Sequence, residues 1–160
     1  MATSPQAPEM RIQVRRVFAA PRERVYRAWI EREGLEEWMC RDVPTHRVKY
    51  TELEARTGGR YVMEVTDTAT GEEYIGQGIF HEVTPPQKLV FTWEWKKRQR
   101  DGSEVALHPE TQVTVEFWER GSSTEVLLTH EFLRTEETAR STEQGWKGCF
   151  DALALFVEES

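Results

Sequence analysis

Residues 135–160 constrain the fold most, because they carry the longest helical pattern in the chain. Their apolar side chains recur at steps of three and four, as on one face of an amphipathic helix; they are Trp146, Cys149, Phe150, Leu153, Phe156 and Val157. Nearly everything before this helix reads as strands, so a sheet must bury its apolar face. Gly145 and Gly148 flank Trp146, and each costs up to about 1 kcal/mol in a helix interior. We expect them either to permit a close backbone contact or to leave space beside the tryptophan.

Period-two alternation and short connecting turns predict antiparallel strands before this helix. The expected strands span residues 10–18, 46–53, 60–66, 74–83, 88–95, 111–119 and 124–132.

Two shorter features complete the expected order of elements. After the first strand, one short helix should begin at Pro21 and end at Gly34, and a second helical turn should carry Leu35 and Trp38. Residues 96–110 hold a cluster of lysines and arginines, with a glycine and a proline, and we expect a solvated loop there.

Length and charge favour one soluble domain. A chain of 160 residues is most economically a single domain, and we assign it to residues 10–160, after a flexible tail at 1–9. The net charge of −7 argues against nucleic-acid binding, which needs a basic surface. The N-terminus does not read as a signal peptide, and no apolar run is long enough to span a bilayer. We therefore expect a cytoplasmic protein with no membrane insertion.

Several phrases along the chain resemble a known family. They are FAAPRERVYRAW, GLEEWMC, TGGRYVMEV, PPQKLVFTWEW, VTVEFWERGSSTEVLLTHE and QGWKGCFDALALF. In this order and spacing they resemble the START-like (SRPBCC) superfamily, and within it the group similar to the C-terminal domain of the activator of the 90-kDa heat-shock-protein ATPase. The resemblance implies an α+β helix-grip fold, in which a curved antiparallel sheet of six to seven strands wraps around the long C-terminal helix. It also implies a cavity between helix and sheet, where related proteins hold apolar or aromatic small molecules.

The candidate pocket residues come from the inner faces of the expected strands and helices. They are Trp38, Tyr61, Met63, Gly78, Phe91, Trp93, Trp95, Leu128, His130, Trp146 and Phe150. Large aromatic side chains can line a ligand site or simply fill a core. The sequence leaves both interpretations open.

His130 is the most notable polar candidate, because alternation places it on the same face as Val126 and Leu128. It could orient a polar ligand group, act as an acid or base near neutral pH, or be a hydrogen-bonded core residue. We assign no catalytic residue. The histidines and the two cysteines, Cys40 and Cys149, lack metal-ligand spacing, so we expect no metal or cofactor. The cysteines read as reduced thiols, although the sequence does not exclude a bridge.

Three functions remain compatible with the sequence. The leading hypothesis is a cytosolic, non-enzymatic binding protein for an apolar or aromatic small molecule. One alternative is a cyclase- or hydrolase-like enzyme that uses the same pocket with His130 as acid or base. The other is a co-chaperone-like interaction module, which we rank last because the chain has no room for the N-terminal domain that makes major chaperone contacts in the eukaryotic activator. An outer sheet face could also support a homodimer.

Overall fold

A seven-stranded antiparallel sheet and three helices form the fold, in a computed structural model that describes residues 10–158. The strand order across the sheet is β1-β7-β6-β5-β4-β3-β2. The elements are β1 (Met10–Phe18), α1 (Arg22–Arg27), α2 (Arg32–Trp38), β2 (His46–Leu53), β3 (Arg60–Asp67), β4 (Glu73–Thr84), β5 (Lys88–Arg98), β6 (Glu104–Arg120), β7 (Ser123–Leu133) and α3 (Glu136–Glu158). The predicted α+β helix-grip fold is therefore confirmed, while the predicted tail at 1–9 lies outside the described residues.

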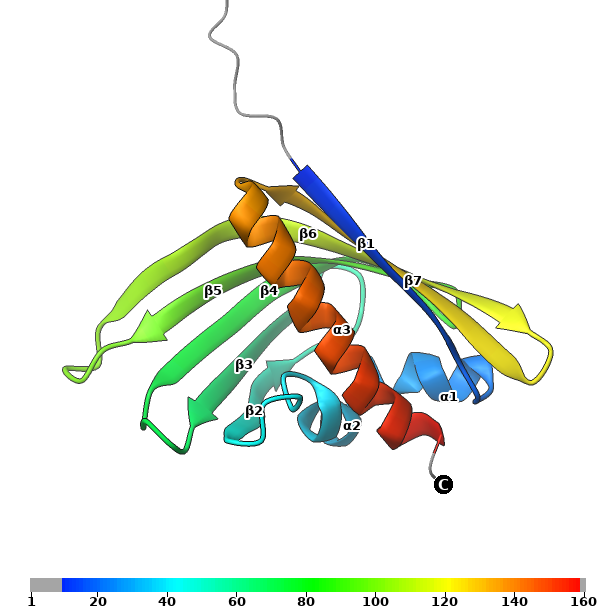
Figure 1. Ribbon diagram of the computed structural model, residues 1–160, viewed down its shortest axis with the longest axis horizontal. Helices are drawn as coiled ribbons and strands as arrows, with labels where there is room; N and C mark the ends of the chain where they lie inside the picture. The colour runs from blue at the N-terminus through cyan, green and yellow to red at the C-terminus, as the bar shows by residue number, and fades with distance from the viewer. Residues whose placement is uncertain (1–9, 159–160) are drawn as a thin grey trace, which may run out of the picture.

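The long helix α3 lies across the concave face of the curved sheet (Figure 1). Its buried side chains follow the predicted spacing; they are Ala139, Trp146, Cys149, Phe150, Leu153, Ala154 and Val157. Phe150 packs edge-on against Phe18 of β1, with the ring centroids 5.6 Å apart. Placing Phe156 in this buried stripe was wrong, because 40% of its surface is exposed.

The two short helices α1 and α2 follow β1, as expected, but Gly34 does not end the first of them. Helix α1 ends at Arg27, and Gly34 lies inside α2. A β-carbon added at Gly34 would lie 3.2 Å from the ring of Phe156. The glycine thus marks a close approach between α2 and α3 rather than a helix end.

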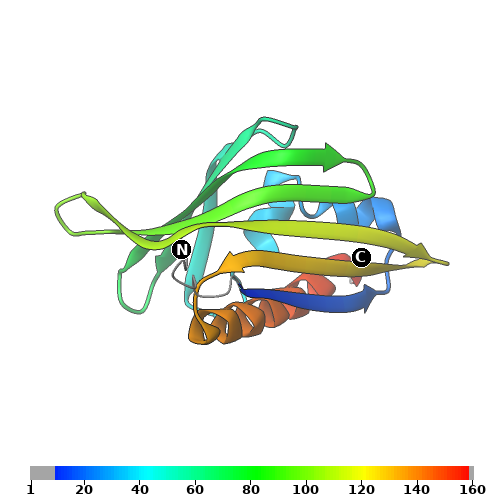
Figure 2. The same ribbon diagram turned by 90° about the horizontal axis from the view of Figure 1, so that it is seen from above.

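Residues 96–110 do not form the expected loop, because β5 and β6 continue through most of this segment as a hairpin. Residues 99–110 are all exposed, as expected. Figure 2 shows this hairpin reaching past the rest of the sheet. Its basic side chains are paired: Lys97 contacts Glu72 at 2.7 Å, and Arg98 contacts both Glu64 and Glu73. Lys97 and Arg98 therefore pair with carboxylates on β3 and β4 or in the turn that joins them, and Lys96 pairs with Glu104 of β6.

Candidate ligand-binding cavity

A cavity of about 350 Å³ lies beneath the N-terminal half of α3. Its walls come from three parts of the chain: the segment that joins α2 to β2, the strands β5 to β7, and α3 itself. The lining residues are Met39, Cys40, Asp42, Val43 and His46; Trp93, Trp95, His108, Pro109, Thr111, His130 and Phe132; Leu133 and Arg134; and Thr138, Ser141, Thr142, Gly145, Trp146 and Cys149.

The cavity exists because α3 changes the size of its inward side chains along its length. In the C-terminal half, Phe150, Leu153 and Val157 are buried and fill the space above the sheet. In the N-terminal half, four cavity-lining positions hold small side chains at helical spacing, namely Thr138, Ser141, Thr142 and Gly145, and Trp146 is the large side chain beside them. The same helix therefore closes a packed core at one end and covers an open space at the other.

The two glycines of α3 have different roles. A β-carbon at Gly145 would meet no atom within 4 Å, so this glycine faces open space at the cavity. A β-carbon at Gly148 would overlap the side-chain carboxylate of Asp42. Gly145 therefore leaves space beside Trp146, whereas Gly148 permits a close contact with the segment that carries Asp42.

Three tryptophans supply most of the aromatic wall. Trp93 and Trp146 are tilted by 44° with their centroids 5.1 Å apart, and Trp93 meets Trp95 edge-on at 5.5 Å. Trp146 comes from α3, whereas Trp93 and Trp95 come from β5 and are only partly buried. These rings present a broad apolar surface on which a flat apolar molecule could pack.

His130 holds this wall in place through a chain of hydrogen bonds. Trp146 donates its indole N–H to His130 Nδ1 at 3.0 Å; because an indole can only donate, Nδ1 carries no proton. The proton of the neutral ring is then on Nε2, which lies 2.7 Å from the Thr111 hydroxyl. Thr111 in turn donates to the Trp93 carbonyl at 2.8 Å.

The same arrangement makes His130 hard to protonate. Its side chain is 1% exposed, and burial lowers its pKa from 6.5 to about 4. Protonation would also place a donor on Nδ1 opposite the Trp146 donor. His130 is therefore a neutral residue that orients Trp146, and both of its nitrogens are occupied.

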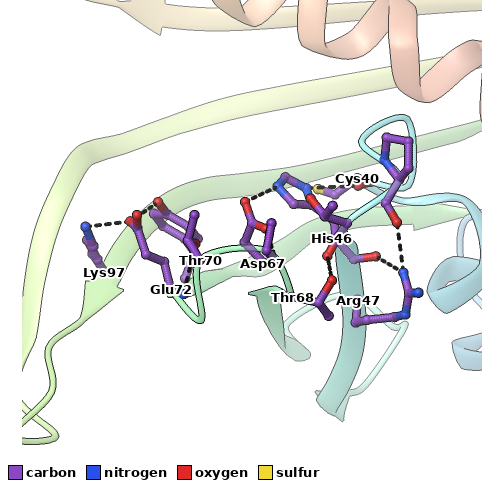
Figure 3. Close-up of polar contacts among 12 residues, drawn as sticks. Cys40, His46, Arg47, Asp67, Thr68, Thr70, Glu72 and Lys97 are labelled. Carbon is purple, nitrogen blue, oxygen red and sulfur yellow. Dashed lines mark hydrogen bonds and ion pairs between the residues drawn. The ribbon is translucent and has the colours of Figure 1, made fainter.

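The segment between α2 and β2 forms a third wall of the cavity, and polar contacts hold it (Figure 3). His46 Nδ1 donates to the Cys40 carbonyl at 3.2 Å, and its Nε2 lies 4.0 Å from the Asp67 carboxylate. The Thr45 carbonyl accepts from the backbone N–H and the hydroxyl of Thr68. These bonds anchor the segment to the turn between β3 and β4.

The rim of the cavity carries the unusual backbone angles. Among residues 10–158, the non-glycine residues with left-handed backbone angles are Cys40 (φ 57°) and Phe132 (φ 70°), and both line the cavity. Such angles cost a non-glycine residue about 1 kcal/mol or more, and they often occur at functional sites. Phe132 and Val43 are 39% and 37% exposed, so apolar side chains also occur at the mouth.

Four of the predicted pocket residues line the cavity: Trp93, Trp95, His130 and Trp146. Tyr61 and Phe91, with Trp93, border a separate recess of about 20 Å³. The others lie in the core or the sheet backbone; they are Trp38, Met63, Leu128 and Phe150, all almost fully buried, and Gly78, where a β-carbon would overlap the Thr92 carbonyl.

The predictions missed three parts of the wall, and the first comprises His108, Pro109 and Thr111 of β6 with Phe132, Leu133 and Arg134 at the end of β7. The second is the segment from Met39 to His46, and the third is on α3, where the small residues of its first half and Cys149 line the cavity. The spacing of Thr138, Ser141, Thr142 and Gly145 is the signal that could have found the small residues of α3.

Two charged side chains also line the cavity: Asp42 and Arg134. In the part of the chain that the structure describes, no three His, Cys, Asp or Glu side chains gather closely enough to hold a metal ion. No helix within residues 10–158 is long and apolar enough to cross a membrane.

The curved sheet, the gripped helix and the cavity between them define a START-like helix-grip domain. Residues 19–158 match the family model described as "Activator of Hsp90 ATPase homolog 1-like protein". The chain belongs to this family, as the sequence resemblance predicted. None of the curated proteins compared with the chain matches it.

Solved structures agree with this assignment. CV1439 from Chromobacterium violaceum is 25% identical, with a TM-score of 0.80 over 94% of this chain and 98% of that chain. A protein from Rhizobium leguminosarum is 23% identical, with a TM-score of 0.77 over 96% of this chain and 97% of that one. The AHSA1-like protein from Aeromonas hydrophila is 21% identical, with a TM-score of 0.75 over 93% of this chain and 92% of that one. The last two similarities show the fold alone.

Proposed function

We propose that this protein binds an apolar or aromatic small molecule in the cavity between α3 and the sheet. The observation that carries the proposal is the open space of about 350 Å³ beside Gly145, walled by Trp93, Trp95 and Trp146. Ligand sites commonly enclose about 300–1,000 Å³ and are lined mainly by apolar and aromatic side chains. The volume is near the lower end of that range, which favours a compact ligand over a long acyl chain.

The polar side chains of the cavity suggest how such a ligand is oriented. Asp42 and Arg134 are exposed, whereas Trp146 is buried against the sheet. We therefore expect the apolar part of the ligand against the tryptophans and any polar group toward Asp42, Arg134 or the α3 hydroxyls.

The geometry of His130 favours binding over acid–base catalysis. A general base needs a free nitrogen within reach of the substrate and a pKa near the working pH. Both ring nitrogens of His130 have protein partners, and burial lowers its pKa to about 4. We accordingly propose a non-enzymatic role.

A fluorescent apolar probe tests the proposal. N-phenyl-1-naphthylamine is neutral and becomes bright in apolar surroundings, so its titration reports an accessible apolar site. We expect saturable binding of one probe per chain, accompanied by quenching of tryptophan fluorescence, and displacement by a subset of apolar or aromatic metabolites. A linear, non-saturating signal with unchanged tryptophan emission would reject the binding function.

The description of the family supports a second candidate, contact with a chaperone of the Hsp90 class. This candidate predicts that immobilised chaperone retains the protein and that its ATP turnover changes on addition of the protein. We place the protein in the cytoplasm because Cys40 and Cys149 are both free thiols, which suits a reducing compartment. A homodimer through an outer sheet face stays a proposal that a solution mass measurement would test.

A further inference from the structure

Two cysteines that are distant in the sequence meet in the wall of the cavity. Cys40 follows α2, at the left-handed backbone position of the connecting segment, and Cys149 projects from α3. Both line the cavity and both are free thiols. Cys40 is half-buried, whereas Cys149 is 7% exposed.

The backbone segments that carry these cysteines are in direct contact. The thiol of Cys149 donates to the Asp42 carboxylate at 3.8 Å, two residues beyond Cys40. Gly148 allows this approach, because a β-carbon there would overlap the same carboxylate. The connecting segment therefore lies against α3 at the turn that carries Cys149.

The two thiols also interact with one another. A hydrogen bond with the Cys149 side chain is the largest influence that raises the pKa of Cys40 well above its usual value, followed by burial and the charge of Asp42. This influence requires the two side chains to be neighbours. His46 fixes the position of Cys40 further, since its ring bonds the Cys40 carbonyl.

We propose that Cys40 and Cys149 form a modification site, at which a two-electron oxidant such as hydrogen peroxide converts the thiol pair into a disulfide. One thiolate attacks a peroxide oxygen; an S–O bond forms, the O–O bond breaks, and the departing hydroxide takes up a proton to become water. The other thiolate then attacks the sulfenic sulfur; the S–S bond forms, the S–O bond breaks, and the departing hydroxide takes up a proton to become a second water. Each sulfur loses one electron, and the peroxide gains two.

The disulfide would tie the connecting segment to α3 and so fix two walls of the cavity relative to one another. It would close a loop of roughly 100 residues, for which the loss of chain entropy in the unfolded state is large. The thiolate is the reactive form. Because the pKa of Cys40 is raised, we expect oxidation to be slow at neutral pH and to accelerate as the pH rises.

Intact mass under denaturing, non-reducing conditions tests the proposal on the full chain after treatment with hydrogen peroxide. We expect a monomer that is about 2 Da lighter and that dithiothreitol restores, with a linked peptide pair containing Cys40 and Cys149. The melting temperature should rise on the order of 10 °C. Cys40→Ser and Cys149→Ser are the matched controls, and neither should lose this mass.

Three results would overturn the proposal. One is a wild-type protein that takes up oxygen in steps of about 16 Da at the same rate as the two single variants. The second is disulfide-linked dimers in place of the lighter monomer. The third is a melting temperature that falls on formation of the intramolecular bond, which would show that the native thiols are not placed for it.

Discussion

At the scale of single residues, the arrangement of the cavity depends on the contact between His130 and Trp146. The indole N–H of Trp146 can only donate a hydrogen bond, so the His130 nitrogen that faces it must be the acceptor. The ring of Trp146 is also stacked on Trp29, with their centroids 6.0 Å apart. Trp146 thus belongs to the core on one side and to the cavity wall on the other.

Replacing Trp146 should separate these two roles. Trp146→Ala should lower the free energy of unfolding by about 3–5 kcal/mol, because it removes a buried aromatic ring. Trp146→Phe should keep much of the packing and cost about 1–3 kcal/mol, since it leaves His130 Nδ1 buried without a donor. Urea unfolding measures both values. A loss well below 1 kcal/mol for the alanine variant would show that α3 does not lie where the structure places it.

His130 should make the protein less stable in acid. In the folded state it stays neutral down to its pKa of about 4, whereas in the unfolded chain it takes up a proton near pH 6.5. The unfolded state then binds more protons between these values, so stability falls as the pH drops from about 6.5 to about 4, by about 3 kcal/mol in total.

Proton NMR of the imidazole C–H signals checks this pKa directly, and His130→Gln identifies the His130 signals by their loss. The unfolding free energy of the variant should depend less on pH over the same window than that of the wild type. A His130 midpoint close to 6.5 would contradict the buried, neutral ring.

At the scale of elements, α3 determines where the cavity lies. Its spacing predicted a buried stripe correctly for Trp146, Phe150 and Leu153, because hydrophobic periodicity reports which face is inward. Periodicity does not report whether the inward face meets another side chain or an open space. That distinction comes from the size of the inward side chains, which are small at Thr138, Ser141, Thr142 and Gly145 of α3, and from the strands that face them.

Other elements show the same limit. Alternation locates the strands, and their order predicts the sheet, but the basic residues at 96–100 favour a loop where the structure has strand. There β5 pairs with β4 and β6 through Arg98, and its basic side chains lie beside carboxylates such as Glu72 and Glu64 that are distant in the sequence. The segment from Met39 to His46 was missed for the same reason, since contacts with Asp67 and Thr68 place it.

The two glycines of α3 provide a matched pair of substitutions. Gly145→Ala should raise the free energy of unfolding by up to about 1 kcal/mol, because it gains helix propensity and meets no neighbour. Gly148→Ala gains the same propensity but must displace the Asp42 side chain, so it should be less stable than Gly145→Ala. Thermal or urea unfolding of both variants measures the difference. Equal stabilisation by the two substitutions would mean that the connecting segment does not pack on α3.

At the scale of the whole molecule, the fold keeps one half of α3 in a core and the other half over a cavity. The sequence resemblance was correct about the family and the helix-grip fold. The sequence identified four of the lining residues, Trp93, Trp95, His130 and Trp146. It missed the stripe of small residues on α3, because periodicity marks an inward face by its large apolar side chains. The fold places α3 over the sheet, and the small side chains of Thr138, Ser141, Thr142 and Gly145 leave the cavity between them.

A ligand in this cavity should stabilise the whole fold. At a free probe concentration of about 100 times its dissociation constant, binding to the native state adds about 2.7 kcal/mol, which corresponds to a rise of roughly 5–10 °C in the melting temperature. Differential scanning calorimetry with and without N-phenyl-1-naphthylamine measures this rise. An unchanged or lower melting temperature under saturating probe would mean that the probe does not prefer the native state.

The affinity of N-phenyl-1-naphthylamine for Gly145→Leu, compared with Gly145→Ala, tests the open cavity most directly. Both substitutions add a side chain where a β-carbon meets no atom within 4 Å, and both remove a helical glycine, so neither should destabilise the fold. We predict that Gly145→Ala binds the probe within about twofold of the wild type and that Gly145→Leu loses at least about tenfold, because its side chain occupies the space beside Trp146. Equal affinities for the wild type and both variants would place the bound probe elsewhere and contradict a binding site beneath α3.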